Sequence, residues 1–268
     1  MEEDLNYYNE HDAFAAQWLR ELIIDGLIPD GTVDSRSIVD VEAKDLSEYT
    51  QCHFFAGIGG WSRALELAGW EPDRPVWTGS PPCQPFSSAG THTAFDDKRD
   101  LWFAWYDLIR GCRPRAIFGE QVATSIKHGW LDRAAADLAA AQYRLGAIVL
   151  QAASVNAPHR RERLFIVADT CDPRLQGQRR PRQEPVAKRR QGTKRHRASN
   201  SFWGASTIYC RDKKHRAAPL QPEIQPMVNG LPEGLGRVGL LKGAGNAIVP
   251  QAAAEIIKAY MEHDNGQS

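Results

Sequence analysis

Cys83 is the residue in this chain whose surroundings most clearly suggest chemistry. It lies in the stretch GSPPCQPFSSAG, between Pro82 and Pro85, directly after a segment that is typical of a strand. Prolines restrict the backbone on both sides, and the polar residues that follow indicate an exposed loop. A cysteine buried as a small apolar side chain is the alternative, but it fits poorly with two prolines. An exposed thiol held in this way can attack an electrophilic carbon.

Two further groups of polar residues stand where strands are expected to begin or end. Glu120 directly follows the apolar run AIFG, and burial at such a place would raise the pKa of its carboxyl group so that it can donate a proton. Arg161 and Arg163 stand two residues apart before LFIVA, on one face of a strand, where they could bind a carbonyl oxygen. Alone, such a glutamate more often caps a helix and such arginines solvate a strand. Together with Cys83 they indicate a catalytic site.

The stretch FAGIGG, residues 55 to 60, follows an expected strand and opens an expected helix. Glycines in this context allow a ligand to approach the backbone and the N-terminus of the helix. The stretch does not have the G-x-G-x-x-G spacing, which argues against a nicotinamide cofactor. A purely structural turn is the alternative.

Charge is distributed unevenly, although the net charge is zero. Residues 1–50 carry thirteen acidic and three basic side chains, whereas residues 174–216 carry fourteen Lys or Arg against two acidic residues. A basic stretch of this density is typical of a segment that binds phosphates of a nucleic acid. A solvated loop without a partner is the alternative.

Composition restricts the class of protein. The chain has 268 residues, of which 42% are hydrophobic, so it can bury a substantial core. Its five cysteines form no C-x-x-C pair, so neither a disulfide framework nor a metal site is indicated. No apolar run is long enough to span a bilayer, and the acidic start MEEDLNYYNE is unlike a signal peptide. We expect an intracellular protein without membrane contact.

Alternating strands and helices must position these residues. From Cys52 onward, apolar runs typical of strands alternate with amphipathic segments, which predicts a parallel sheet covered on both faces. The expected strands are near residues 52–55, 75–79, 116–120, 146–155 and 163–169, and the expected helices are near 60–70, 100–114, 130–143 and 250–263. Upstream, HDAFAAQWLRELIIDG predicts a helix capped by Asp12, and residues 38–41 could form a brief strand.

The order of these motifs resembles the DNA cytosine-5 methyltransferases. FAGIGG, PPCQPFS, a Glu-x-Val turn, Arg-x-Arg before a strand and GNAIVP follow one another over about 200 residues. The resemblance is to a short variant of phage or bacterial type, linked to restriction-modification or solitary. It implies a Rossmann-like α/β fold that uses S-adenosylmethionine, with a reduced sheet and a small, irregular, basic target-recognition region. It also implies a monomer that acts on double-stranded DNA.

The resemblance implies a role for each motif. Cys83 would attack C6 of a flipped cytosine, Glu120 would protonate or hydrogen-bond N3, and Arg161 would hold O2, with Arg163 beside it. Transfer of a methyl group from S-adenosylmethionine to C5 would follow. The expected cofactor-binding residues are Phe55, Ala56, Gly57, Ile58, Gly59, Gly60, Ser80, Pro82, Leu101, Asn246 and Ala247.

The resemblance also divides the chain. We expect an N-terminal helical segment at residues 1–50, a catalytic core at 51–169, the basic target-recognition region at 170–235 and a C-terminal segment at 236–268 that returns to the core. A defective relative that only binds DNA, and a methyltransferase acting on RNA, are the alternatives.

Three departures from the family pattern stand out. Gln121 replaces the usual Asn, and His159 replaces the usual Gln. Only EPDRP separates the first helix of the core from its next strand, whereas the family usually inserts two strands and a helix with acidic residues for the cofactor. We therefore expect the acidic N-terminal segment to cover the bare sheet edge and to supply a carboxylate, Asp40 or Glu42.

Overall fold

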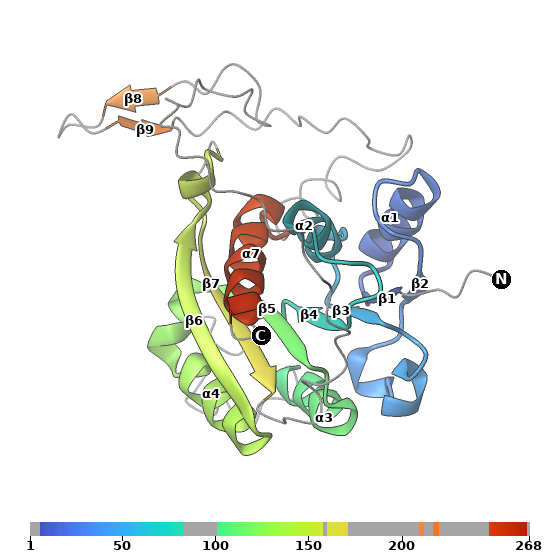
Figure 1. Ribbon diagram of the computed structural model, residues 1–268. Coiled ribbons are helices and arrows are strands. Elements are labelled where there is room, and N and C mark those ends of the chain that lie inside the picture. The colour runs from blue at the N-terminus through green and yellow to red at the C-terminus, as the bar shows by residue number, and fades with distance from the viewer. Residues whose placement is uncertain are drawn as a thin grey trace, which may run out of the picture.

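A computed structural model describes residues 6–82, 101–157, 160–170, 209–211, 217–219 and 247–266. Its centre is a seven-stranded sheet in the order β2-β1-β3-β4-β5-β7-β6 (Figure 1). The strands of this sheet are β1 (Asn6–Asn9), β2 (Thr32–Asp34), β3 (Gln51–Phe54), β4 (Val76–Gly79), β5 (Ala116–Val122), β6 (Tyr143–Gln151) and β7 (Glu162–Thr170). A separate pair consists of β8 (Tyr209–Arg211) and β9 (Ala217–Pro219).

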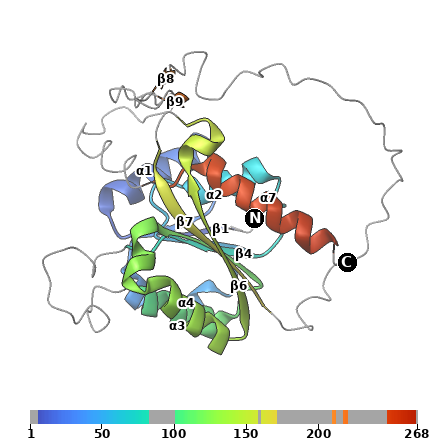
Figure 2. The same cartoon turned by 90° about the vertical axis from the view of Figure 1, so that its left-hand side faces the viewer.

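Helices cover both faces of the sheet (Figure 2). They are α1 (Ala13–Ile24), α2 (Gly60–Ala68), α3 (Trp102–Cys112), α4 (Trp130–Ala140) and α7 (Pro250–Gly266), with 3-10 turns η1 (Ile38–Asp40), η2 (Ala43–Leu46), η4 (Ala123–His128) and η5 (Ala152–Val155). Helices α1, α2 and α7 lie on one side, and α3 and α4 lie on the other. This arrangement confirms the expected α/β fold class. The apolar faces of the helices on both sides are buried by packing against the sheet.

The aromatic residues of the helices fill the two cores. Trp102, Trp105 and Trp130 are buried between the sheet and the α3–α4 layer. Trp61 and Trp70 are buried on the opposite face, against α7. The parallel strands β1, β3 and β4 between these layers are buried along their whole length, as is typical of a sheet covered on both faces.

The sheet is mixed, whereas the sequence predicts a wholly parallel sheet. Strand β7 is antiparallel to both β5 and β6. The connection from β6 to β7 contains only η5 and no crossover helix, so the chain has to return in the opposite direction.

The N-terminal residues supply two strands of the main sheet. Strand β1 pairs in parallel with β3, and β2 pairs in parallel with β1 at the edge. The sheet is therefore not reduced, because the β1-α1-β2 unit stands where the core itself lacks strands. The brief strand expected at residues 38–41 is instead the 3-10 turn η1, which leads out of β2.

Helix α1 forms as its sequence predicts. The Asp12 side chain accepts hydrogen bonds from the backbone N–H groups of Phe14 and Ala15, which satisfies two donors at the first turn. Trp18 and Leu19 are buried, and Leu19 packs with Tyr8 of β1 and Ile28. This packing fixes α1 against the edge of the sheet.

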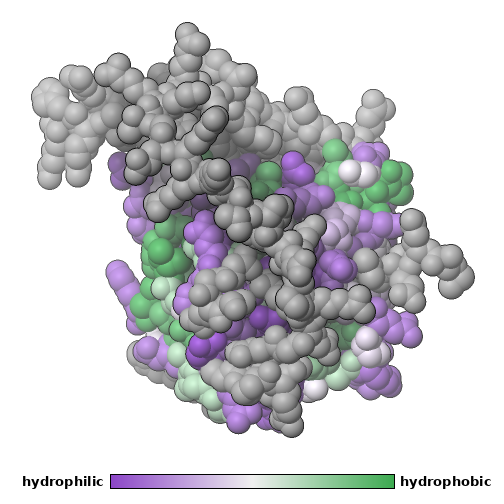
Figure 3. All heavy atoms as spheres, in the orientation of Figure 1, coloured by the Kyte–Doolittle hydropathy of each residue, from purple (hydrophilic) through white to green (hydrophobic). Residues whose placement is uncertain are grey.

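Apolar side chains reach the surface on the face drawn in Figure 3. Ile24 and Leu27 are exposed at the end of α1, and Ile148 and Val149 are exposed on the edge strand β6. Within the described ranges, no helix is long and apolar enough to cross a membrane.

Candidate active site at the carboxyl edge of the sheet

Three neighbouring parallel strands, β1, β3 and β4, end in register along one edge of the sheet, and β5 continues to Val122 beside them. Successive pairs join Asn9 to Phe54, Phe54 to Gly79, and Gly79 to Gly119. The residues that directly follow these aligned positions are Glu10, Phe55, Ser80 and Glu120. In open α/β proteins ligands bind outside the carboxyl ends of the strands, so this edge is the candidate site.

The glycine turn after β3 is open toward this edge. Gly57 has φ +57°, and a Cβ atom added there would meet no heavy atom within 4 Å. Gly59, with φ +76°, caps the start of α2. Such positive φ values are accessible to glycine at little cost. The turn thus leaves room for a ligand beside the backbone, as the sequence predicts.

Glu10 directly follows β1 and faces the glycine turn. Its carboxylate accepts hydrogen bonds from the Gly57 N–H group, at 2.8 Å, and from the Asp12 N–H group, at 2.8 Å. Burial raises the pKa of Glu10, and these backbone bonds act against that rise. The Ala56 N–H group also bonds to the Asn9 carbonyl oxygen, so the ends of β1 and β3 are joined at two points.

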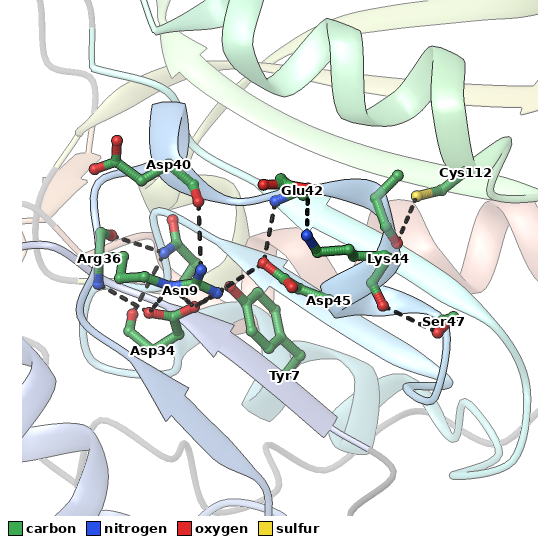
Figure 4. Close-up of polar contacts among 11 residues, drawn as sticks. Tyr7, Asn9, Asp34, Arg36, Asp40, Glu42, Lys44, Asp45, Ser47 and Cys112 are labelled. Atoms are coloured by element: carbon green, nitrogen blue, oxygen red, sulfur yellow. Dashed lines mark hydrogen bonds and ion pairs between the residues drawn. The ribbon is translucent and has the colours of Figure 1, made fainter.

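The carboxylates expected to serve a cofactor, Asp40 and Glu42, are placed elsewhere (Figure 4). Glu42 forms an exposed ion pair with Lys44 at 2.8 Å on the connector between β2 and β3. Asp40 is exposed on the same connector. Neither directly follows a strand of the sheet, whereas Glu10 does. Sequence reasoning missed Glu10 because no strand was expected at residues 6–9.

The carboxylate of Asp34, at the end of β2, is bound by Tyr7 and Arg36 (Figure 4). It accepts a hydrogen bond from the Tyr7 hydroxyl at 2.7 Å and forms an ion pair with Arg36 at 2.7 Å. Burial opposes ionisation, but the bonds from Arg36 prevail and lower the pKa of Asp34. Arg36 also bonds to Asp45, which ties the connector to the end of β2.

Glu120 and Arg163 form the polar centre of the site on the far side of β4. The Arg163 Nε atom lies 2.8 Å from the Glu120 Oε1 atom, and the Glu120 side chain is only 9% exposed. Burial raises the pKa of Glu120, while the charges of Arg163 and Arg161 partly offset that rise. The pair can hold a carboxyl group ready to donate a proton beside a fixed positive charge.

Arg161 points to a different neighbour from Arg163. Its Nη2 atom donates a hydrogen bond to the Ala247 carbonyl oxygen at 2.6 Å. That both arginines bind a substrate carbonyl stays a prediction.

The backbone that leads to Cys83 is held at its described end. Trp61 donates its indole N–H to the Ser80 hydroxyl oxygen at 3.0 Å, and the Gln121 side chain donates to the Pro81 carbonyl oxygen at 3.0 Å. Gln121 is 3% exposed. Gln121, which in the sequence stands out only as a departure from the family pattern, therefore holds the backbone before Cys83 in place.

Several predicted residues lie outside the described ranges. They are Cys83, His159, Asn246 and almost all of the basic stretch 174–216. Of the other expected cofactor-binding residues, Leu101 is half-buried at the start of α3, Pro82 is exposed, and Ala247 is half-buried before α7.

The fold belongs to a class that is seen in methyltransferases. A solved structure of the methyltransferase EhMeth of Entamoeba histolytica matches with a TM-score of 0.51 and 10% identity, over 96% of this chain and 98% of that one. At this identity the likeness concerns the fold alone.

Sequence comparison finds similarity to one family over about half of the chain. Residues 72–202 match the family model described as C-5 cytosine-specific DNA methylase, which confirms the resemblance to the DNA cytosine-5 methyltransferases. The type II methyltransferase M.AplI of Arthrospira platensis is 34% identical over 35% of this chain and 28% of its own length. M.HhaI of Haemophilus parahaemolyticus is 24% identical over 52% of this chain and 54% of its own length. The chain thus matches about half, or less, of the length of these relatives.

Proposed function

We propose that this protein transfers a methyl group from S-adenosylmethionine to C5 of a cytosine flipped out of double-stranded DNA. The observation that carries the proposal is the buried Glu120–Arg163 pair, which lies on the same sheet edge as the strand end that leads to Cys83. The match of residues 72–202 to the cytosine-specific family supports the choice of base.

Cytosine C5 is a poor nucleophile, so the proposed reaction begins at the neighbouring carbon. The Cys83 thiolate adds to C6, and the electron pair of the C5–C6 double bond is accepted by the ring toward N3. A protonated Glu120 stabilises this adduct by a hydrogen bond or proton transfer at N3, for which its raised pKa is suited. We propose that Arg163 rather than Arg161 makes the O2 contact, which the ion pair between Arg163 and Glu120 supports.

The residues present fit S-adenosylmethionine, which supplies an electrophilic methyl group when bound. Glu10 offers carboxylate oxygens next to the open glycine turn at Gly57, where ribose hydroxyl groups could donate to it. After methylation, loss of the C5 proton to solvent, expulsion of the Cys83 thiolate and return of any N3 proton to Glu120 would restore the aromatic ring and the free enzyme.

The basic stretch at residues 174–216 would hold the DNA by its phosphates while the base is flipped. We further propose that the protein acts as a monomer in the cytoplasm of a bacterial host. We also propose the domain boundaries at residues 50, 169 and 235. Residues 6–34 belong to the same sheet as the catalytic core, so the N-terminal segment is part of one packed unit with it.

Covalent trapping tests the proposed function. DNA that carries 5-fluorocytosine at the target should form a protein adduct that survives denaturation, because fluorine cannot leave as the C5 proton does. Cys83→Ser should abolish the adduct, and Cys112→Ser is the matched control that should retain it. Bisulfite sequencing of DNA from cells that express the protein would show the modified sequence. Absence of both signals, with DNA binding retained, would favour a defective relative.

A further inference from the structure

Arg161 connects two parts of the chain that are 86 residues apart in sequence. Its guanidinium donates a hydrogen bond to the Ala247 carbonyl oxygen at 2.6 Å, and its own carbonyl oxygen accepts from the Ala152 N–H group at 3.2 Å. The residue has φ +23°, which is rare for a side chain other than glycine. A conformation of this kind persists only where surrounding contacts hold it, and here they hold both the backbone and the side chain.

Ala247 begins the return segment, residues 247–249, which leads into α7. Ile248 in this segment is 7% exposed and packs on Gly60, where an added Cβ atom would lie only 2.8 Å from its Cγ1 atom. Gly60 is the last residue of the glycine turn and the first of α2. The return segment is therefore bound by Arg161 at one end and packs against the glycine turn beside it.

Arg163 stands two residues further along the chain, in β7, and forms an ion pair with Glu120. The charge of Arg161 also acts on Glu120, but its side-chain hydrogen bond goes to the return segment.

We propose that Arg161 is a positioning residue that sets the return segment against the glycine turn, so that cofactor affinity depends on Arg161 and not on Arg163. This inference rests on the proposed function, because it assumes that the glycine turn binds S-adenosylmethionine. It departs from the expectation that both arginines act on the base.

Calorimetry with S-adenosylmethionine on the full chain tests the inference, with Arg161→Met and Arg163→Met as a matched pair. Arg161→Met keeps much of the side-chain stem but loses the charged donor, so the dissociation constant should rise about tenfold or more. Arg161→Lys should recover part of the affinity, because an ammonium group can still donate to the carbonyl oxygen. Arg163→Met should bind the cofactor within about twofold of wild type and lose methyl transfer instead.

A double-mutant cycle separates positioning from general damage. Ile248→Ala should also weaken cofactor binding, and its effect combined with Arg161→Met should be less than additive, since both act on the return segment. Thermal melting of each variant identifies any that fail to fold, in which case Arg161→Lys provides the comparison.

The two possible failures have different signatures. If wild type binds S-adenosylmethionine and Arg161→Met binds it equally well, or Arg163→Met loses as much affinity, the inference is overturned while the proposed function stands. Fully additive effects in the cycle would also overturn it. If wild type binds no S-adenosylmethionine, the proposed function fails, and the inference fails with it.

Discussion

At the scale of single residues, Glu10 is the carboxylate that we propose to bind the cofactor. Two backbone N–H groups, from Gly57 and Asp12, hold it at the edge of the sheet beside an open turn. A buried carboxylate that already accepts backbone bonds loses little freedom when a further donor arrives, which favours binding of a hydroxyl-bearing ligand. Glu42 has the same side chain but is exposed on the connector, so the two glutamates form a natural comparison.

Replacing Glu10 with Gln should weaken S-adenosylmethionine binding by roughly 10- to 100-fold, because a hydrogen bond to a charged acceptor contributes about 1.5–3 kcal/mol. Glu42→Gln should leave the affinity unchanged. Calorimetry on the two variants and wild type measures the effect. Equal affinities for all three proteins would remove Glu10 from the cofactor site.

At the level of the strands, one buried polar row crosses the centre of the sheet. Tyr8, His53 and Thr78 are directly paired on β1, β3 and β4. His53 shares a 2.8 Å hydrogen bond with Thr78, and its ring stacks on Tyr8 with centroids 5.0 Å apart. The row joins the N-terminal unit to the core through β3. Burial lowers the pKa of His53 to about 3, so the ring is neutral in the folded protein.

Stability should therefore depend on pH through His53. In the unfolded chain a histidine takes up a proton below about pH 6.5, whereas folded His53 stays neutral until about pH 3. The unfolded state then binds more protons, so the free energy of unfolding should fall with decreasing pH, by at most about 1.4 kcal/mol per pH unit from this residue.

Chemical denaturation at several pH values between 5 and 7 measures this slope. His53→Gln should reduce this slope by up to the contribution of one proton, about 1.4 kcal/mol per pH unit. His11→Gln, at an exposed site, serves as the control. Identical slopes for wild type and His53→Gln would contradict the assignment of this pH dependence to His53.

Across the whole molecule, acidic and basic side chains are separated along the chain. The first fifty residues carry a net charge of −10, and residues 174–216 carry +12. The acidic part includes the β1-α1-β2 unit at one edge of the sheet. A partner rich in phosphate would be attracted to the basic stretch and repelled from the acidic unit, which would orient DNA before specific contacts form.

This charge separation predicts a steep salt dependence of DNA binding. The logarithm of the affinity should fall with the logarithm of salt concentration by roughly 0.9 for each phosphate neutralised. Changing Arg189, Arg190, Lys194 and Arg195 to Gln should flatten that slope and leave S-adenosylmethionine binding unchanged. Fluorescence anisotropy over a salt series measures both slopes, and equal values would indicate that these charges are only solvated.

The sequence by itself determined the features that depend on neighbours along the chain. The Asp12 cap of α1, the glycine turn before α2 and the strand that begins at Ala116 are local patterns, and the structure contains each of them. That strand continues past Glu120 to Val122, two residues beyond the predicted end. The order of the short motifs along the chain also carries the resemblance to the DNA cytosine-5 methyltransferases, which the match of residues 72–202 supports.

Tertiary structure decided the features that depend on pairing between distant residues. Strand β1 is only four residues long and has asparagine at both ends, so its sequence carries no strand periodicity. It can be buried because Asn6 and Asn9 donate their side-chain amides to carbonyl oxygens of Asp30 and Arg36. Pairing of β1 with β3 in turn places Glu10 beside Gly57.

Arg161 and Arg163 also differ through contacts with distant residues that the sequence pattern does not predict. Arg161 and Arg163 are equivalent in the sequence pattern, and a period of two predicts that they share a face. The positive φ at Arg161 breaks that period, and the return of the chain at Ala247 provides a partner for one arginine only. Contacts between segments far apart in the chain decide such differences, and no local pattern of residues contains them.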